Sequence, residues 1–544
     1  MRVSEGLGQR SDPRNMDDII QNGAGLAWSR FNRFLPTQLE ASGQAQPGRA
    51  DFVIDAVDRF LEQAAHRPDA PAIVMDGACV SYADLEDRAR MLACLFAEHE
   101  APSILIALPP GADAYAAMLA AGLAHGFYTP LNLNSPPAKL RRICSQLQPD
   151  IIVGTPAMLR ILAGQAPGAR EIDPACIHSQ GRFEGSGTRN DIAYIIFTSG
   201  STGVPKGVVV QRSGLDHYVD WIGSALGVAP TDRMSQYANI AFDLSVLEIY
   251  GALCYGASLH PAFGQGDRLM PARMARREQL TLWVSVPSVV GLMLQAGELT
   301  PDHLGSIRRF VFCGEPLLTH QVAAIFEACP DCVVQNTYGP TEATVSMTSV
   351  TMIASDYLRE CGASVAIGEP ITGMELLLLG GPSVDAGELV IIGPQLARGY
   401  WRDEVATERA FRTIILDGAA CRAYFTGDWV ERRGGRLFFR ERVDFQVKVK
   451  GFRIELGDVA AAIASCGHAA VCVFKHDQVL VAVVEQADGD VDAPALRAAL
   501  ALTIEPHAIP QIIRSIAQLP RNDNDKIDRR LTIAWFAATA AAVA

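Results

Sequence analysis

The stretch that decides the fold reads Tyr194-Ile-Ile-Phe-Thr198-Ser-Gly200-Ser-Thr202-Gly203-Val-Pro-Lys206-Gly207-Val-Val-Val210. Two apolar runs flank a cluster of small residues, which predicts a strand, a loop and a second strand. Glycines let the backbone of such a loop approach a ligand, and its hydroxyl and N–H groups can bind phosphate oxygens. Lys206 adds a positive charge for the same anion. The spacing fits neither the Walker motif nor the dinucleotide fingerprint, and such a cluster can also be a plain turn between strands.

The composition is that of a soluble globular enzyme with two or more domains. The chain has 544 residues, of which 49% are hydrophobic and 20% charged. Its net charge of −13 argues against nucleic acid or an anionic membrane surface as a partner, because both attract clustered Lys and Arg. No apolar run approaches the roughly 18 residues of a membrane span. We therefore predict no signal peptide, no membrane insertion and a cytoplasmic location.

The twelve cysteines do not follow the spacing of a disulfide framework, which favours a reducing compartment. Cys329-Pro-Asp-Cys332 is the one CxxC pair in the sequence. Because no second pair or histidine cluster accompanies it, we interpret it as two plain thiols rather than as a metal or redox site.

Patterns of apolar residues divide the chain into four parts. Residues 1–50 are rich in Gly, Gln, Ser, Pro and Arg, and we expect a leader or docking arm, or a disordered segment. Residues 51–443 predict a large N-terminal α/β domain of mixed, mainly parallel sheets with covering helices. Residues 444–530 predict a small, mobile C-terminal α+β lid domain. The apolar tail 531–544 is too short to span a bilayer and predicts a docked helix.

Local signals place several elements in the large domain. Asp76-Gly77 between two short apolar runs predicts a hairpin over 72–80, and Ser81-Tyr-Ala-Asp84 predicts a capping box that opens a helix. Further strands are predicted at 104–108, 128–131 and 151–154, and further helices at 112–124 and 139–147. We expect the alternation of strands and helices to continue to about Gly435.

Six further motifs follow the glycine-rich loop. They are Phe242-Asp-Leu-Ser245, Asn336-Thr-Tyr-Gly-Pro-Thr-Glu342, Gly387-Glu388 to Gly399-Tyr400, Tyr424-Phe-Thr-Gly-Asp428, Arg442-Val-Asp444 through Leu456, and Asn524-Asp-Lys526-Ile-Asp-Arg529. Together with the loop, over about residues 52 to 530, they resemble the core motifs of the adenylate-forming superfamily, most closely the amino-acid adenylation domains of nonribosomal peptide synthetases. Phe312-Cys313-Gly314-Glu315 and Asn336 through Val345 are also similar to the D-alanine–carrier protein ligases.

The resemblance implies a site for ATP. An amino-acid carboxylate attacks the α-phosphorus of ATP and pyrophosphate leaves, so the site must position two anions and neutralise their charge. By resemblance, the phosphates are bound by Thr198, Ser199, Gly200, Ser201, Thr202, Gly203 and Lys206, the adenine by Asn336, Thr337 and Tyr338, and the ribose by Asp428 and Arg442. Glu342 would be the ligand of Mg²⁺. The expected catalytic residues are Lys526, Thr198, Glu342 and Arg442.

The resemblance also implies two working positions of the lid. Lys526 would bridge the substrate carboxylate and the α-phosphate, where its charge stabilises the transition state. A rotation at the hinge, Asp444, would then replace Lys526 with Lys448 and Gly451, which line a tunnel for pantetheine. The chain departs from the family twice here, because Asp525 and Glu441 stand where glycine is usual.

Asp243 separates amino-acid activators from activators of fatty or aryl acids, because a buried carboxylate at this place pairs with the substrate ammonium. The alternative is a helix N-cap. The other pocket positions map to Leu244, Leu247, Val284, Val311, Cys313, Gly314, Thr337, Val345, Ser346 and Lys526. Apart from Lys526 these residues are aliphatic or small and neutral, which predicts a small neutral amino acid. The resemblance to the D-alanine–carrier protein ligases implies that a cysteine at the place of Cys313 narrows the pocket, which favours alanine, D or L, with serine, 2-aminobutyrate and valine as alternatives.

The acceptor is expected to be a separate protein. In synthetase modules of this family a carrier domain follows the Lys526 motif, whereas here 18 residues follow Lys526 and none is serine. We expect transfer to the phosphopantetheine thiol of a separate carrier protein. Two alternatives remain: an acyl- or aryl-CoA ligase of the same superfamily, which should lack Asp243, and a non-catalytic adenylate-binding protein, which should have lost Lys526, Glu342 or Asp428.

Overall fold

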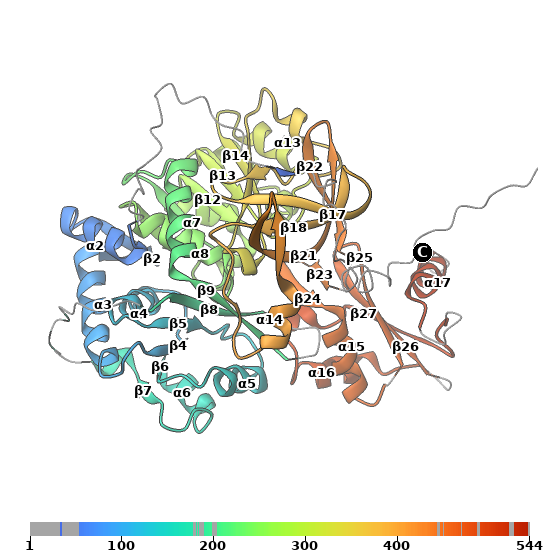
Figure 1. The fold of residues 1–544 in the computed structure, drawn as a ribbon, viewed down its shortest axis with the longest axis horizontal. Coiled ribbons are helices and arrows are strands. Elements are labelled where there is room, and N and C mark those ends of the chain that lie inside the picture. Colours follow the sequence, from blue (N-terminus) through green and yellow to red (C-terminus); the bar gives the residue numbers. More distant parts are fainter. Residues whose placement is uncertain are drawn as a thin grey trace, which may run out of the picture.

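A computed structural model of the chain describes residues 33–34, 54–177, 181, 183, 190–198, 204–442, 446–449, 451–468, 470–486, 490–521 and 527–541. Within these residues the fold consists of three large sheets followed by two small ones, with helices packed against them (Figure 1). The small sheets and their helices, drawn in orange to red, lie together at one side of the molecule (Figure 1).

The first large sheet contains the two strands that flank the glycine-rich loop. Its order is β19-β9-β8-β5-β4-β6-β7, and the pairs from β8 to β7 are parallel. The apolar strands are buried along their length, as expected for a parallel sheet covered on both faces. The strands are β4 Ser103–Ala107, β5 Phe127–Pro130, β6 Ile151–Gly154, β7 Arg170–Ile172, β8 Ile192–Thr198, β9 Lys206–Gln211 and β19 Gly399–Tyr400. Helix α3 Tyr82–Phe96 precedes β4, and the helices between β4 and β7 are α4 Ala112–Leu123, α5 Pro137–Leu147 and α6 Pro156–Leu162.

The second large sheet has the order β16-β15-β14-β13-β12-β10-β11-β2-β3, with parallel pairs from β14 to β2. Because β10, β12, β13 and β14 are parallel, the loops that follow them meet at one edge of the sheet. The strands are β2 Pro71–Met75, β3 Ala78–Ser81, β10 Arg233–Gln236, β11 Ser258–Pro261, β12 Leu282–Ser285, β13 Arg309–Phe312, β14 Val333–Tyr338, β15 Thr348–Met352 and β16 Glu369–Pro370. The helices are α2 Ala56–His66, α7 Arg212–Leu226, α8 Leu244–Leu253, α9 Gly264–Leu269, α10 Pro271–Glu278, α11 Ser288–Gln295, α12 Pro301–Leu304 and α13 Thr319–Ala328.

The third large sheet corrects the expected alternation of strands and helices up to Gly435. From Glu375 the strands β17, β18, β21, β20 and β22 pair antiparallel, and only α14 Glu404–Ala410 intervenes. Tight turns at Asp417-Gly418 and Gly434-Gly435, all with positive φ, connect these strands as hairpins. The strands are β1 Arg33–Phe34, β17 Glu375–Ser383, β18 Ala386–Ile392, β20 Phe411–Leu416, β21 Ala419–Arg433 and β22 Arg436–Arg442.

The C-terminal part has a separate core. The hairpin β23–β24 and the sheet β25-β26-β27 pack with α15 and α16 around Val459, Ile463, Leu480 and Leu500. The elements are β23 Gln446–Val449, β24 Phe452–Glu455, α15 Leu456–Ser465, β25 Val471–His476, β26 Val479–Glu485, α16 Ala493–Leu500, β27 Ile512–Ile516 and α17 Arg529–Ala541. The predicted tail helix is confirmed, since α17 buries Phe536 against the ring of Phe474.

The local predictions in the large part are confirmed as well. The hairpin β2–β3 turns at Asp76 and Gly77, and Ser81 and Asp84 form the capping box of α3. The expected hinge, Asp444, lies outside the described residues, as do residues 1–50 apart from Arg33 and Phe34, so their roles stay predictions. No helix within the described ranges is long and apolar enough to cross a membrane.

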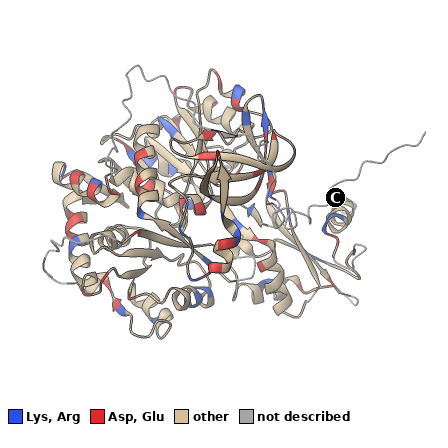
Figure 2. Ribbon diagram, in the orientation of Figure 1, with Lys and Arg blue, Asp and Glu red and all other residues tan. Residues whose placement is uncertain are grey.

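The distribution of charged residues along the chain and the state of the cysteines agree with the composition. Figure 2 shows acidic and basic residues interspersed along the elements of the large and the small parts, without a basic stripe in this view. Cys329 and Cys332 are buried free thiols, and the described residues contain no cluster of side chains suited to a metal ion.

Candidate active site

A cleft of about 1810 Å³ lies where the loops after the parallel strands of the second sheet meet the hairpin β23–β24. Its lining includes Thr198, Asp243, Cys313, Asp428, Arg442, Lys448 and Gly451. Ligands of α/β sheets commonly bind outside the carboxyl ends of parallel strands. The fold therefore brings residues from motifs far apart in the sequence to one cleft.

Asp243 occupies the N-cap position of α8, but its side chain makes no capping hydrogen bond. Instead, Thr341 Oγ1 donates a hydrogen bond to Asp243 Oδ2 at 2.6 Å. Burial raises the pKa of Asp243, and the hydrogen bond from Thr341 and the nearby Lys448 only partly offset this. Among the described residues Asp243 forms no ion pair within 4.0 Å, so a half-buried carboxylate faces the cleft without a cation of the protein bound to it.

Only part of the predicted amino-acid pocket lines the cleft. Leu244, Cys313 and Gly314 belong to its lining, together with Asp243. Six other predicted pocket residues are buried behind this lining, namely Leu247, Val284, Val311, Thr337, Val345 and Ser346. Their contact with a substrate stays a prediction.

A polar network supports the wall behind Cys313. Tyr218 Oη donates to Ser346 Oγ at 3.3 Å, and Ser346 Oγ donates to Thr337 Oγ1 at 3.0 Å. Thr337 Oγ1 in turn donates to the carbonyl oxygen of Phe312 at 2.9 Å. Tyr218 lies in α7, outside every motif that the sequence analysis identified, and only the tertiary contact reveals it.

Glu342 is completely buried and is paired with a residue of the C-terminal hairpin. Arg453 Nη1 lies 3.0 Å from Glu342 Oε2, and Tyr400 Oη donates to Glu342 Oε1 at 2.8 Å. Burial alone would raise the pKa of Glu342, but Arg453 and Tyr400 lower it below its usual value. Arg453 and Tyr400 both lie within the sequence motifs, but the motifs did not indicate their contact with Glu342.

The predicted nucleotide residues at the end of β14 and along β21 and β22 form a second cluster. Asp428 and Arg442 stand directly opposite each other in neighbouring strands, and Arg442 Nη1 lies 2.6 Å from Asp428 Oδ1. Tyr338 Oη donates a hydrogen bond to Asp428 Oδ2. Asn336 Nδ2 donates to the Ala366 carbonyl at 2.9 Å, while its buried Oδ1 has no hydrogen-bond partner in the described part of the chain.

The glycine-rich loop is described only at its two ends. Thr198 closes β8 and pairs with Lys206, the first residue of β9. Lys206 Nζ lies 5.5 Å from the centre of the Tyr400 ring, in a cation–π contact. Ser199, Gly200, Ser201, Thr202, Gly203 and the two lid residues Asp444 and Lys526 lie outside the described residues.

Gly451 fits closely against the large part. Its φ is +81°, and a Cβ built there would lie 2.7 Å from Val286 Cγ1. Its N–H donates to Glu315 Oε1, which makes Glu315 a further contact that the motif Phe312 to Glu315 contained without an assigned role. Lys448, from the same hairpin, lies in the cleft lining. The predicted tunnel residues therefore face the large part in this structure.

The C-terminal part is also held by contacts that the sequence did not predict. Lys139 of α5 forms an ion pair with Glu505, and both side chains are largely buried. The ring of Phe452 contacts two other rings. Its centroid lies 5.5 Å from that of Phe242, in an edge contact, and 3.7 Å from that of His507, which is stacked on it. Burial lowers the pKa of His507 to about 4, so a neutral ring stacks on Phe452 near pH 7.

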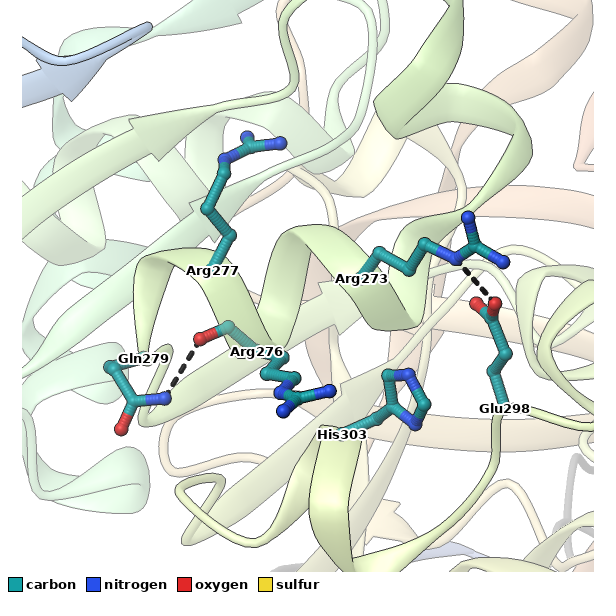
Figure 3. Close-up of a pocket in the computed structure, with 6 residues that line it drawn as sticks. All are labelled: Arg273, Arg276, Arg277, Gln279, Glu298 and His303. Carbon is teal, nitrogen blue, oxygen red and sulfur yellow. Dashed lines mark hydrogen bonds and ion pairs between the residues drawn. The ribbon is translucent and has the colours of Figure 1, made fainter.

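A second hollow lies along α10 and is lined by Arg273, Arg276, Arg277, Gln279, Glu298 and His303 (Figure 3). Each arginine forms an ion pair with a neighbouring carboxylate, Arg273 with Glu298, Arg276 with Asp302 and Arg277 with Asp267. Because acidic groups neutralise these arginines, the hollow does not compete with the cleft as a site for phosphates.

The fold and the cleft define an adenylate-forming enzyme, with a large α/β part and a small α+β part that meet at the site. The chain belongs to the AMP-binding enzyme family, whose model matches residues 60–401. The predicted superfamily and fold class are thus confirmed, and the protein is an ATP-dependent ligase.

Individual relatives agree with this assignment. The chain is 31% identical over 513 residues to the D-alanine–D-alanyl carrier protein ligase of Lacticaseibacillus rhamnosus, covering 89% of this chain and 99% of that protein. It is also 31% identical over 489 residues to tyrocidine synthase 3 of Brevibacillus parabrevis, covering 86% of this chain but only 7% of that protein. The solved Vibrio cholerae adenylation domain AlmE, in complex with glycyl-adenosine-5'-phosphate, has a TM-score of 0.76 at 26% identity, covering 91% of this chain and 99% of that chain.

Proposed function

We propose that the protein activates a small neutral amino acid with ATP, releasing pyrophosphate, and transfers it from aminoacyl-AMP to the phosphopantetheine thiol of a separate carrier protein. Alanine is the favoured substrate, with its D or L configuration open. The similarity over nearly the full length of a D-alanine–D-alanyl carrier protein ligase supports the amino acid and the acceptor. The similarity to a domain solved with glycyl-adenosine-5'-phosphate supports a small side chain and an aminoacyl adenylate.

The observation that carries this proposal is the environment of Asp243. Its carboxylate faces the cleft, accepts a hydrogen bond from Thr341 and has no ion-pair partner among the described residues. A half-buried carboxylate in this setting is stabilised when a substrate supplies an ammonium group. A fatty or aryl acid has no such group, so the acyl- and aryl-CoA ligase alternative would leave the carboxylate unpaired.

The neutral lining beside Asp243 supports a small neutral side chain. The lining includes Leu244, Cys313 and Gly314 as well as Asp243, and the other described residues predicted for the pocket are buried. Burial raises the pKa of the Cys313 thiol, which is therefore neutral near pH 7. A charged or long polar side chain would lose its hydration here without gaining a partner.

ATP is proposed to lie along the rest of the cleft. Thr198 and Lys206, at the ends of the glycine-rich loop, would bind the phosphates, and Asp428 with Arg442 would bind the ribose hydroxyls. Asn336 has an unpaired buried Oδ1, which can accept a hydrogen bond from an adenine amino group. Tyr338, whose hydroxyl is bound to Asp428, would pack its ring against the base.

Glu342 is the residue proposed to hold Mg²⁺. A carboxylate oxygen is a ligand that Mg²⁺ accepts, and one or two carboxylates together with substrate phosphates commonly complete its site. The buried carboxylate fits this requirement, although Arg453 must withdraw from it before a metal ion binds. When bound, the ion would screen the phosphate charges from the attacking carboxylate.

The two half-reactions are proposed to use different faces of the C-terminal part. Lys526 would approach the cleft for adenylate formation, and a rotation at Asp444 would then bring Lys448 and Gly451 to it. The close contact of Gly451 with Val286 and Glu315 supports the second arrangement as the one in this structure. There a thiol would attack the acyl carbon of the adenylate, and AMP would leave.

An exchange assay tests the proposal. The enzyme is incubated with ATP, Mg²⁺ and labelled pyrophosphate against a panel of D- and L-amino acids, and formation of labelled ATP is measured. We expect the fastest exchange with alanine or another small neutral amino acid. Exchange with fatty or aryl acids alone, or no exchange with any acid, would contradict the proposed activity.

A further inference from the structure

The wall behind the amino-acid pocket contains a strained turn. Thr344 has a φ of 53° and Val345 a φ of 69°. Both residues are β-branched, and in this left-handed region their side chains crowd their own backbone. Such conformations persist only where the surrounding structure holds them in place, and they cluster at functional sites. The turn therefore needs an external support.

Gln395 supplies this support from the loop between β18 and β19. Its side-chain Nε2 donates to the carbonyl oxygens of Thr344 at 3.0 Å and of Ser346 at 3.2 Å. In the other direction, Thr344 Oγ1 donates to the main-chain oxygen of Gln395 at 2.7 Å. Gln395 is completely buried, so water cannot replace these bonds. Both ends of the strained turn are therefore tied to one side chain.

The position of the turn Thr344–Ser346 determines where the pocket wall lies. Ser346 Oγ lies 3.0 Å from Thr337 Oγ1 and 3.6 Å from Cys313 Sγ. Cys313 Sγ also lies 3.9 Å from the carbonyl oxygen of Val345. Since Cys313 lines the cleft beside Asp243, a shift of the turn would move the surface that a substrate side chain meets.

We propose that Gln395 is a positioning residue of the amino-acid pocket, which holds the turn Thr344–Ser346 and thereby fixes Cys313. Gln395 lies between the two ends of a sequence motif, Gly387-Glu388 and Gly399-Tyr400, and no role had been assigned to it there. The inference rests on the proposed activation of a small amino acid in this cleft. It adds a residue that selects the substrate without contacting it.

The test replaces Gln395 with methionine, which keeps the volume of the side chain and removes both N–H donors. In the exchange assay, with the amino acid that the wild type uses fastest, we expect the KM for the amino acid to rise about tenfold. The KM for ATP should rise by about threefold or less, because the turn hydrogen-bonds Thr337 of the predicted adenine residues, whereas Asn336 and Tyr338 are held by Ala366 and Asp428. The preference for this amino acid over valine should also fall.

A matched variant controls for the loss of a buried amide. Gln335 is equally buried and donates to Ser349 Oγ at 2.8 Å, away from the strained turn. Gln335→Met should leave both KM values within about twofold of the wild type. A rise of the amino-acid KM in this control equal to that in Gln395→Met would overturn the inference.

A second substitution tests the strain directly. Glycine adopts the φ of Thr344 without crowding, so Thr344→Gly in the Gln395→Met background should bring the amino-acid KM back to within about threefold of the wild type. If Gln395→Met alone is insoluble, we expect the double variant to fold, because Thr344→Gly removes the strain that Gln395 would otherwise hold. A double variant no better than the single one, or a parallel rise of both KM values in Gln395→Met, would overturn the inference. A wild-type enzyme without amino-acid-dependent exchange would instead overturn the proposed function.

Discussion

Arg453 Nη1 lies 3.0 Å from Glu342 Oε2, so an arginine of the C-terminal hairpin neutralises a carboxylate that is completely buried in the large part of the chain. A buried carboxylate of this kind is stabilised by its partner, because a charge removed from water is costly unless a counter-ion compensates it. The stability of the protein therefore depends on the ionisation of Glu342. The contact also couples the position of the C-terminal part to the site proposed for Mg²⁺.

The lowered pKa of Glu342 predicts that stability depends on pH. A carboxylate whose pKa is lower in the folded state stabilises that state only while it is ionised. The contribution is fully present above 4.5, the ordinary pKa of this group, and is lost as the pH falls through the folded-state pKa. We expect Glu342→Gln to lower the melting temperature by about 2 to 5 °C near pH 7, and the difference from the wild type to shrink toward acid pH. Thermal unfolding monitored by circular dichroism measures both, and a difference independent of pH would contradict the assignment.

Asp243→Ala should remove amino-acid activation and spare ATP binding. Without the carboxylate the substrate ammonium loses its partner, and we expect amino-acid-dependent exchange to fall by about a hundredfold or more. Binding of ATP, measured by calorimetry, should be unchanged. Thr341→Val, which removes only the hydrogen bond to Asp243, is the control and should cost about tenfold or less. Loss of ATP binding in Asp243→Ala would show that this residue has a structural role.

Lys526→Ala should separate adenylate formation from transfer. The proposed charge at the α-phosphate acts only in the first half-reaction, so exchange should fall by about two orders of magnitude or more. Transfer from chemically prepared aminoacyl-AMP to a thiol should remain, because that step uses the other face of the C-terminal part. Exchange close to that of the wild type would refute the role of Lys526.

Lys139→Ala should impair transfer and spare adenylate formation, which is the reverse of the effect expected for Lys526→Ala. Lys139 and Glu505 lie on opposite sides of the predicted hinge at Asp444, so their ion pair favours the arrangement seen here and would separate on rotation. We expect thioester formation to fall about tenfold while exchange stays within about twofold. The exchanged pair Lys139→Glu with Glu505→Lys should restore part of the transfer rate. Arg88→Ala breaks an exposed pair with Asp113 and is the control. Equal losses in both half-reactions would contradict this view.

The acceptor is tested by labelling. Enzyme, ATP, Mg²⁺ and radiolabelled alanine are mixed with and without holo carrier proteins from the same gene neighbourhood, and acid-stable label is followed. We expect label on a carrier and not on the enzyme. Gly451→Val should block this transfer and leave exchange within about threefold, because a Cβ at this position meets Val286. Coenzyme A as the preferred acceptor, or label on the enzyme itself, would rule out a separate carrier.

The sequence by itself determined the family, the fold class and most of the local structure. Strands such as β4 and helices such as α3 follow from apolar periodicity and from the capping box of Ser81 and Asp84, which depend only on nearby residues. Through the resemblance to the adenylate-forming superfamily, the motifs also predicted which side chains would share a site. The antiparallel run from Glu375 to Arg442 was missed, since strands linked by tight glycine turns form without a helix between them.

The tertiary structure alone decided which partner each site residue has. Arg453 with Glu342, Thr341 with Asp243 and Tyr218 with Ser346 join residues about 100 positions apart or more, and sequence spacing gives no information about such contacts. Burial likewise raises the pKa of Asp243, while an arginine from another part of the chain lowers that of Glu342. Both effects arise from distance and solvent exclusion, which exist only once the chain has folded.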